Sequence, residues 1–325
     1  MTRLLLSALF CCLLSGGVGY LLLPLLRALK AGQSVRDIGP TWHNIKAGTP
    51  LMGGLMFIIA TIACLLLNIP VMKDFTAFYV LIPGLCFGLV GFLDDFCKVK
   101  FKRDLGLTGI QKAMLQMAVS AIYLYVLYRR GTLSCDLYIP FFNVTFAVHP
   151  IAYIFFAMFV MVGCVNAVNL TDGVDGLCAS VTVPVMVFFA AVAMLGGKGD
   201  LALLPACLVG ALLAYLVYNW HPAKVFMGDT GSLFLGGVIC SLAFALDIPL
   251  VLIFAGFIYI IETLSDIIQV AYFKATHGKR IFKMAPIHHH FEMCGWKEEK
   301  IVITFAAVSA VMCVLAWFSI SGLIG

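Results

Sequence analysis

The chain has 325 residues, of which 62% are hydrophobic and only 11% are charged, and its mean hydropathy is +1.05. A water-soluble domain of this length would carry far more charge. Apolar runs of about 20 residues recur along the chain, whereas a transmembrane barrel would show alternating strands of about ten residues. The composition therefore predicts an all-α, polytopic protein embedded in a lipid bilayer.

We expect one transmembrane domain over residues 1–325, with about ten spans. Loops long enough to form a separate soluble domain are absent from the sequence. The predicted spans are 4–26, 51–70, 75–96, 110–130, 150–168, 177–196, 201–218, 232–247, 249–271 and 301–324.

Positively charged residues divide unequally between the two faces that these spans define. Lys and Arg beside short loops stay on the cytoplasmic side, so the richer face is predicted to be cytoplasmic and both termini external. The net charge of +5 reflects this excess, which suits anionic lipid heads and gives no indication of nucleic-acid binding. The richer face holds sixteen, namely Arg27, Lys30, Arg36, Lys46, Lys98, Lys100, Lys102, Arg103, Lys112, Lys224, Lys274, Lys279, Arg280, Lys283, Lys297 and Lys300, and the other holds five, namely Arg3, Lys73, Arg129, Arg130 and Lys198.

An alternative interpretation of the N-terminus is a cleavable signal peptide made of Arg3 and the following LLLSALFCCLLSGG. That interpretation would place the basic loop 27–50 outside, against the charge distribution.

The 12 cysteines lie mostly inside predicted spans, singly or as the pair Cys11 and Cys12, without a CxxC motif. We interpret them as small apolar packing residues and expect neither a zinc site nor a disulfide framework. The external connection 131–149 has short β-type runs around Phe142 and Asn143, which predict a small hairpin.

Unusual residues collect in the predicted cytoplasmic loops, and the first of these loops ends in HNIKAGTPLMGGL. Lys46 beside glycines suits an anion such as phosphate, although for this loop alone a helix start with a positive-inside lysine is the favoured interpretation. Gly84, Gly88 and Gly91 form a small-residue face for close helix packing. Asp94 and Asp95 follow, a carboxylate pair suited to magnesium or to plain solvation.

The stretch VNAVNLTDGVDGL places four polar side chains at the end of a span. Asp172 and Asp175 are three residues apart, so a helical turn would project both from one face, and Asn166 and Asn169 repeat that spacing. Such groups are costly to bury without a polar ligand, which favours a functional role.

Acidic and amide side chains also mark the next two cytoplasmic segments. Asn219 ends the seventh span, and Asp229 lies in a GDTG turn where Thr230 or Ser232 could simply cap the following helix. Glu262, Asp266 and Gln269 lie on one stripe of the ninth span, where a structural hydrogen-bonding role is the alternative.

Three consecutive histidines, His288 to His290, lie in the last cytoplasmic loop. Consecutive residues do not share a helical face, and cysteines at ligand spacing are absent, so we favour phosphate contact or proton transfer over a transition-metal site. The segment that follows, with Trp296 among charged residues, is typical of an interfacial amphipathic helix.

This set of acids, amides and lysines on the predicted cytoplasmic face, which is exposed to water, predicts magnesium-assisted transfer of a phosphorylated group. Five motifs, KAGTPLMGG, GFLDDFCKV, NAVNLTDGVDGL, NWHPAKVFMGDTGSL and MAPIHHHFEMCGW, occur in this order. They resemble those of the phospho-N-acetylmuramoyl-pentapeptide transferases, known as MraY or translocase I. That family belongs to the polyprenyl-phosphate N-acetylhexosamine-1-phosphate transferase superfamily.

The resemblance implies Mg²⁺-dependent transfer of phospho-MurNAc-pentapeptide from UDP-MurNAc-pentapeptide to undecaprenyl phosphate, giving lipid I and UMP. It implies a homodimer in the bacterial cytoplasmic (inner) membrane, an active site facing the cytoplasm, and a role in peptidoglycan synthesis, cell wall biogenesis, cell shape and cell division. The implied catalytic residues are Asp94, Asp95, Asp229 and His288, with Asp229 and Asp172 on the metal. The implied substrate-binding residues are Lys46, Lys112, Asn166, Asn169, Asp172, Asp175, Asn219, Phe226, Gln269 and His289.

Two mechanisms fit this reaction, direct attack by the lipid phosphate and a phospho-enzyme formed on an aspartate. We favour direct attack, because a phosphate monoester is largely ionised near neutral pH and needs positioning more than a strong base. A transferase that uses UDP-GlcNAc is the nearest rival enzyme. An ion-coupled transporter is the rival of another class, disfavoured because the polar residues collect on one face.

Overall fold

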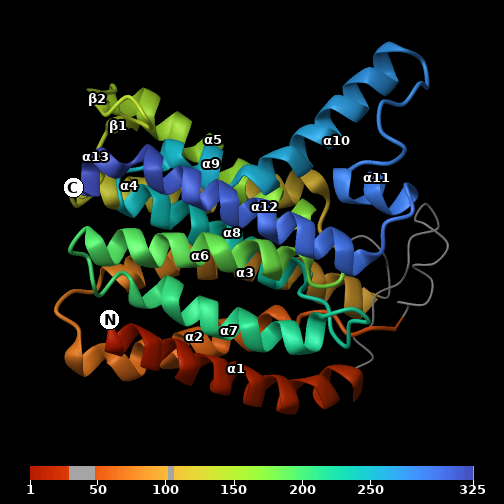
Figure 1. Cartoon of the computed structure of the whole chain (residues 1–325), viewed down its shortest axis with the longest axis horizontal. Helices are drawn as coiled ribbons and strands as arrows, with labels where there is room; N and C mark the ends of the chain where they lie inside the picture. Colours follow the sequence, from red (N-terminus) through yellow and green to blue (C-terminus); the bar gives the residue numbers. More distant parts are fainter. Residues whose placement is uncertain (29–47, 102–105, 325) are drawn as a thin grey trace.

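The computed structural model describes residues 1–28, 48–101 and 106–324, and within them the chain is almost entirely helical. Most helices run along the long axis of the molecule, and both termini lie at one end (Figure 1). The elements are α1 (Thr2–Ala28), α2 (Gly54–Asn68), η2 (Ile69–Val71), α3 (Thr76–Phe101), α4 (Gly109–Arg129), β1 (Asp136–Ile139), β2 (Val144–Ala147), α5 (Pro150–Thr171), α6 (Leu177–Leu195), α7 (Leu203–Asn219), α8 (Gly228–Ala245), η3 (Pro249–Val251), α9 (Leu252–Ala255), α10 (Phe257–Ala275), α11 (Ile287–Met293), α12 (Glu298–Ser319) and α13 (Ser321–Ile324).

The prediction of an all-α, polytopic membrane protein is confirmed. Eight helices of the described segments are long and apolar enough to cross a membrane, and a bent pair would make a ninth. The predicted span 201–218 corresponds to α7, which has only 17 residues. The predicted span 110–130 corresponds to α4, with bounds that differ by one residue.

The predicted span 249–271 is interrupted in the structure by a bend. This segment forms Pro249–Ala255 and Phe257–Ala275, which meet at an angle of 81°. Pro249 starts a 3-10 turn and Gly256 separates the two helices, and both residue types interrupt a regular helix. As a result, α10 leaves the direction of the bundle and projects outward, and the chain returns from its far end to α11 (Figure 1).

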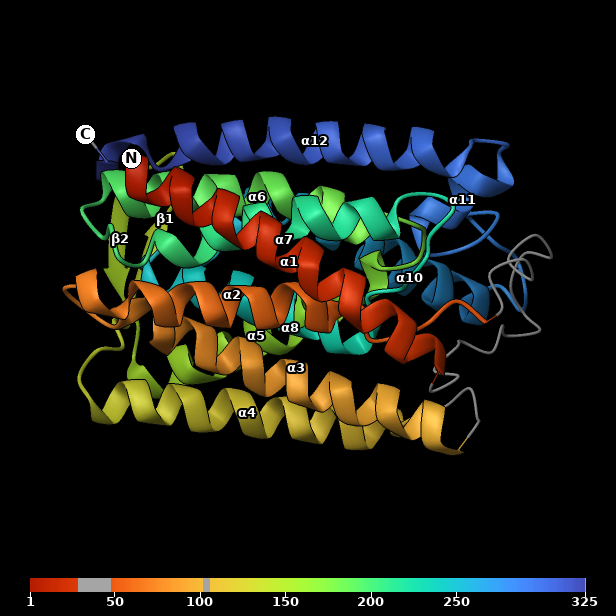
Figure 2. The ribbon, with the colours of Figure 1, turned by 90° about the horizontal axis from the view of Figure 1, so that it is seen from below.

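The core of the bundle is α8, which α3 and α5 cover directly (Figure 2). An 18-residue apolar stretch of α8, long enough to cross a membrane, is 83% buried. The corresponding stretches of α4 and α1, at the periphery, are 17% and 22% buried. The exposed large apolar side chains of those outer helices, such as Leu13 and Leu21 on α1 and Ile122 on α4, are therefore the surface that lipid would cover.

Glycines allow α3 to approach α8 closely, as the small-residue pattern predicted. A Cβ added to Gly84 would meet Val238, one added to Gly88 would lie 3.1 Å from Cβ of Phe234, and one added to Gly91 would lie 2.7 Å from the backbone nitrogen of Thr230. Backbone contact of this kind is how membrane helices associate without a hydrophobic driving force between them.

The hairpin predicted for the connection 131–149 is confirmed as an antiparallel pair, with Asp136 opposite Ala147 and Ile139 opposite Val144. Its tip is tied to the end of α12, because the N–H of Phe141 and the hydroxyl of Tyr138 both donate to the carbonyl of Ser319, at 2.8 and 3.2 Å.

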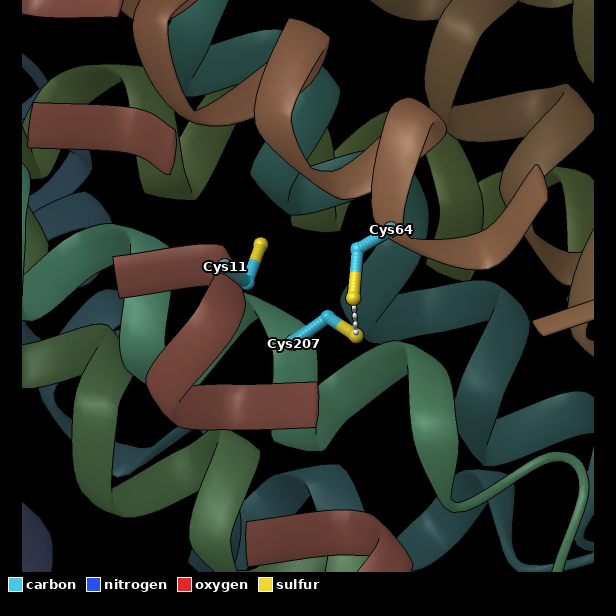
Figure 3. Close-up of side chains that lie close together, drawn as sticks. All are labelled: Cys11, Cys64 and Cys207. Carbon is cyan, nitrogen blue, oxygen red and sulfur yellow. Dashed lines mark hydrogen bonds between the residues drawn. The ribbon is translucent and has the colours of Figure 1, made fainter. Parts of the chain in front are cut away.

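Three cysteines that are far apart in sequence meet between α1, α2 and α7 (Figure 3). The sulfur atoms of Cys11, Cys64 and Cys207 all lie within 4.8 Å of one another, and the Cys64 and Cys207 sulfurs are 3.4 Å apart. All 12 cysteines are free thiols. The prediction of small apolar packing residues without disulfides agrees with this, but the spacing of the cysteines did not indicate that three would meet.

We expect a maleimide to distinguish these three thiols from Cys294 in the folded protein. Cys294 is exposed, whereas the three clustered side chains are 0–1% exposed. Mass spectrometry of the labelled peptides should find modification of Cys294 within minutes and of the cluster only after denaturation. Equal labelling rates under native conditions would contradict the burial of the cluster.

At the end of the bundle that holds the termini, Asp200 joins three segments through its carboxylate. It lies 2.8 Å from a guanidinium nitrogen of Arg3 and accepts N–H bonds from Lys73 at 2.6 Å and Asp74 at 3.2 Å. Burial alone would raise the pKa of Asp200, but the Lys73 N–H, the Arg3 guanidinium and the Asp74 N–H together lower it.

A depressed folded-state pKa means that the Asp200 carboxylate stabilises the fold above its unfolded pKa of about 3.9, and that this stabilisation is lost as pH falls through the folded value. Asp200→Asn should therefore lower the thermal midpoint in detergent at pH 7, by the equivalent of roughly 1–3 kcal/mol. The difference between the two proteins should shrink at about pH 3. A difference that stays constant with pH would show that the charge of Asp200 is not the cause.

Candidate active site

The end of α3 places two carboxylates inside the bundle, of which Asp94 is the first. Asp94 is 3% exposed, and one of its oxygens lies 2.6 Å from Nζ of Lys98, one helical turn later. Its other oxygen accepts a hydrogen bond from the N–H of Leu107 at 2.9 Å. The Asp94 carboxylate therefore ties the end of α3 to the segment that leads into α4.

Asp95, which is fully buried, caps α8 from the neighbouring helix. It accepts hydrogen bonds from the N–H groups of Asp229 at 3.2 Å and Thr230 at 2.9 Å, and from the Thr230 hydroxyl at 2.7 Å. The first N–H groups of a helix have no partner within the helix, and a carboxylate there also opposes the positive end of the helix dipole. The alternative that Thr230 or Ser232 caps α8 is wrong, because the first turn of α8 has no cap from its own side chains.

Asp229, in the first turn of α8, is the point where side chains from three other helices meet. One oxygen lies 2.5 Å from Nζ of Lys112 on α4 and 3.4 Å from Nζ of Lys98 on α3. The other accepts a hydrogen bond from the amide of Asn169 on α5 at 2.9 Å, and that amide also donates to Ser232 at 2.8 Å. Carboxylate oxygens of Asp94, Asp95 and Asp229 lie within 4.8 Å of one another.

Lys98 belongs to this cluster, although the motifs did not single it out. Its ammonium group lies 2.6 Å from Asp94, 3.6 Å from Asp95 and 3.4 Å from Asp229. A signal was present in the sequence, because Lys98 follows the two aspartates by four and three residues and so shares their helical face. It was counted only as one of the basic residues that define orientation.

Asp172 and Asp175 do not share a helical face, so that prediction is wrong. Asp172 is the residue at which α5 ends, with φ −83° and ψ 47°, and Asp175 lies in the turn before α6. Both aspartates lie in the turn of residues 172–176, which contains two glycines and is not helical. Burial first, and then the negative charges of Asp229, Asp95 and Asp175, raise the pKa of Asp172 to about 8.

Asp175 is buried and lies on the other side of this turn. One of its oxygens is 2.9 Å from Nδ1 of His221 and accepts the N–H of Ala223 at 3.0 Å. Among the described residues, a cavity of about 470 Å³ adjoins it, lined by Thr49, Asp175, His221, Glu292, Trp296 and Glu298 among others. This cavity gives the Asp175 side of the site room for a ligand of moderate size.

Several predicted substrate-binding residues hold the scaffold of the site together. Asn219 accepts the N–H of Gly176 and donates to the carbonyl of Val225, which joins the turn after α5 to the segment before α8.

Gln269 accepts the N–H groups of Ile281 and Phe282 and donates to the carbonyl of Phe282. It therefore holds the segment before α11 against α10.

Three other predicted residues lie elsewhere. Asn166 pairs with Gln116 on α4 at 2.7 Å and does not join the Asp229 cluster. Phe226 is half-buried, and its backbone pairs with Pro50 and Gly53. Lys46 lies outside the described residues.

The three consecutive histidines each have a different partner. His288 Nδ1 lies 2.9 Å from Glu262, and His289 Nδ1 lies 2.5 Å from Glu292. His290 Nδ1 accepts the N–H of Lys283 at 3.1 Å. The three imidazoles are therefore engaged by three different segments, α10, α11 and the loop before α11.

These groups lie away from the chain termini. The end of α3 and the start of α4 lie at the opposite end of the bundle from both termini, near α10 and α11 (Figure 2). Two carboxylates from α3, one from α8 and two lysines therefore form a charged cluster at this end of the bundle. Such a cluster has the groups needed to bind a cation and the phosphates of a ligand.

Comparison with known proteins agrees with this site. The family model for glycosyl transferase family 4 matches residues 77–247, the stretch that contains Asp94, Asp95 and Asp229. Curated relatives named phospho-N-acetylmuramoyl-pentapeptide-transferase match almost the whole chain. The one from Clostridium perfringens strain 13 is 48% identical over 305 residues, covering 93% of this chain and 94% of the relative. The one from Clostridioides difficile strain 630 is 46% identical over 320 residues, covering 98% and 97%.

A third such relative, from Clostridium acetobutylicum, is 45% identical over 302 residues, covering 93% of this chain and 94% of the relative. Similarity of this extent includes every motif loop, not only the matched domain. The chain is therefore a multi-pass bacterial membrane enzyme that belongs to the phospho-N-acetylmuramoyl-pentapeptide-transferase family of glycosyl-phosphate transferases.

Proposed function

We propose that this protein transfers phospho-MurNAc-pentapeptide from UDP-MurNAc-pentapeptide to undecaprenyl phosphate, giving lipid I and UMP, the first membrane step of peptidoglycan synthesis. The observation that carries the proposal is the convergence of Asp94, Asp95 and Asp229 with two lysines at one end of the bundle. Near-full-length relatives that bear the transferase name support the same assignment.

We place this reaction at the cytoplasmic face of the inner membrane. The support is the sequence asymmetry, since sixteen of the 21 Lys and Arg residues fall on the face that holds the motif loops. The donor is a charged, water-soluble nucleotide, whereas the acceptor lies in the bilayer, so a site at the membrane surface suits both.

Magnesium fits the residues present. Mg²⁺ prefers oxygen ligands and is usually held by one or two carboxylates together with substrate phosphates. Oxygens of Asp94, Asp95 and Asp229 lie together, and we propose Asp229 as the principal ligand. Asp172, the other predicted ligand, is not in this group, but the charge of Asp229 acts on it. When bound, the ion would neutralise charge on the donor diphosphate.

The contacts of the aspartates support direct attack over a phospho-enzyme. Asp94 is already bound to Lys98 and to the N–H of Leu107, and Asp95 is occupied by the start of α8. Because both carboxylates are held by these contacts, neither is placed to attack phosphorus as a nucleophile.

In direct attack, an oxygen of the lipid phosphate forms a bond to the β-phosphorus of the donor. The bond from that phosphorus to the oxygen bridging to the α-phosphate breaks, and UMP leaves with that oxygen. Lys98 and Lys112 supply positive charge beside the reacting phosphates, which is the main contribution expected of a protein in phosphoryl transfer.

The test is UMP release by the purified protein with undecaprenyl phosphate and either UDP-MurNAc-pentapeptide or UDP-GlcNAc, with Mg²⁺ and with a chelator. We expect release only with the muramoyl donor and only with the metal. Release with UDP-GlcNAc alone would assign a different hexosamine-phosphate transferase. Failure to release UMP from either donor would overturn the proposed reaction.

A further inference from the structure

A buried acid and a buried imidazole meet between α10 and α11. Glu262 is 0% exposed and His288 is 1% exposed, and Oε2 of Glu262 lies 2.9 Å from Nδ1 of His288. The two residues are 26 positions apart, so the contact depends on the chain folding back from α10 to α11. Burying an ionisable pair at this depth costs free energy, so its presence indicates a functional role.

The contact determines which nitrogen of the imidazole carries a proton toward Glu262. A carboxylate has only acceptors, so Nδ1 must donate its hydrogen to Oε2. The opposite nitrogen, Nε2, then points away from Glu262. The direction of Nε2 is therefore set by Glu262, in the way that an outer carboxylate orients a metal-bound or catalytic histidine.

Nε2 of His288 is buried and has no hydrogen-bond partner among the described residues, and the same is true of Oε1 of Glu262. A buried polar atom without a partner costs about 1–3 kcal/mol. The structure keeps this atom next to Gly173, where an added Cβ would overlap the imidazole at Nε2. Gly173 lies between Asp172 and Asp175 in the turn that borders the charged cluster and the cavity.

We propose that Glu262 is a positioning residue for the binding of the nucleotide-sugar donor. It holds His288 so that Nε2 lies beside Gly173 in the 172–176 turn, where Nε2 contacts the bound donor. This inference rests on the proposed function and extends it. Glu262 itself touches neither substrate. Gly173 is part of the same arrangement, because only a residue without a side chain leaves the imidazole in place.

Kinetics of Glu262→Gln, Glu262→Leu and Asp266→Asn test the proposal. Gln keeps an oxygen that accepts from Nδ1, so its kcat should stay within about fivefold of the wild type. Leu removes the acceptor, and kcat should fall by about 10–100-fold, as is usual for loss of an orienting partner. Asp266 is on the same helix four residues later and has no described hydrogen bond, so Asn there controls for loss of a charge on α10.

Stability and a double mutant separate positioning from a structural role. Glu262→Leu leaves Nδ1 of the buried His288 without its partner, which should cost about 1–3 kcal/mol and lower the thermal midpoint by several degrees, so rates are compared well below the midpoint of every variant. If Glu262 acts only through His288, Glu262→Leu should have no further effect on kcat in a His288→Ala background. Unchanged kcat in Glu262→Leu, or an equal loss in both backgrounds, would overturn the proposal.

A spectroscopic measurement distinguishes failure of this inference from failure of the proposed function. In protein labelled with ¹⁵N-histidine, the His288 signal, assigned by its loss in His288→Ala, should show a protonated Nδ1 in the wild type and in Glu262→Gln, but not in Glu262→Leu. This result does not depend on turnover. An unprotonated Nδ1 in the wild type would reject the positioning role even if the enzyme releases UMP.

Discussion

Replacement of Asp229 with Asn is expected to lower the rate of UMP release by about 10²–10³-fold. Asn has nearly the same shape, so the change removes the charge that faces Lys112 at 2.5 Å and Lys98 at 3.4 Å while keeping the bulk of the side chain. The measurement is initial rate against donor concentration with saturating Mg²⁺. The loss should fall mainly on kcat, because charge compensation matters most as the phosphoryl group transfers.

The matched control for this change is Asp136→Asn, at an exposed position of β1 at the other end of the molecule. That variant should release UMP at the wild-type rate. If Asp229→Asn kept more than a tenth of the wild-type kcat, Asp229 would not be the centre of the charged cluster that the geometry indicates.

Gly91→Ala is expected to reduce both stability and activity, although alanine is normally the better helix residue. A Cβ at position 91 would overlap the backbone of Asp229 and Thr230, so α3 and α8 would have to separate. Overpacking of this kind costs about 1–3 kcal/mol. A shift of about 1 Å in the position of the Asp229 carboxylate would reduce kcat by up to about 10²-fold.

Gly163→Ala in α5 is the control for helix propensity, because an added Cβ there would have no heavy atom within 4 Å. It should raise stability by about 0.5–1 kcal/mol and leave kcat unchanged. Thermal midpoints in detergent and initial rates, measured on both variants, make the comparison. Equal effects of the two substitutions would mean that the close approach of α3 and α8 does not matter for the site.

The sequence was sufficient to predict features that depend on local periodicity and composition. Spans follow from apolar runs, and the glycine face of α3 follows from spacing along one helix. The kink at Gly256 was missed because a window of mean hydropathy averages over a short 3-10 turn and the helix after it. Asp172 and Asp175 were given a shared helical face because a spacing of three suggests one, whereas the glycines end the helix at Asp172.

The missing parts of the site prediction are contacts between distant segments. Three such contacts depend on how the helices pack. They are the cap that Asp95 forms on α8, the pairing of Lys98 with Asp229, and the hydrogen bond of Asn219 to the turn at Gly176. A single sequence gives no register between helices, so their partners remain unknown until the fold is seen. Motifs indicated which loops matter, but they did not separate residues that face the cluster from residues that hold its frame.

The cap that Asp95 provides for α8 also sets a time at which the site can form in the cell. Its partner N–H groups lie 134 and 135 positions further along the chain. At a synthesis rate of about 5–20 residues per second, that interval is on the order of ten seconds. Until then, Lys98, four residues after Asp94, is the nearest cation available to the α3 acids. A nascent chain stalled before α8 emerges would hold Asp95 in the membrane without the hydrogen-bond donors of α8, and it is expected to be recognised and degraded.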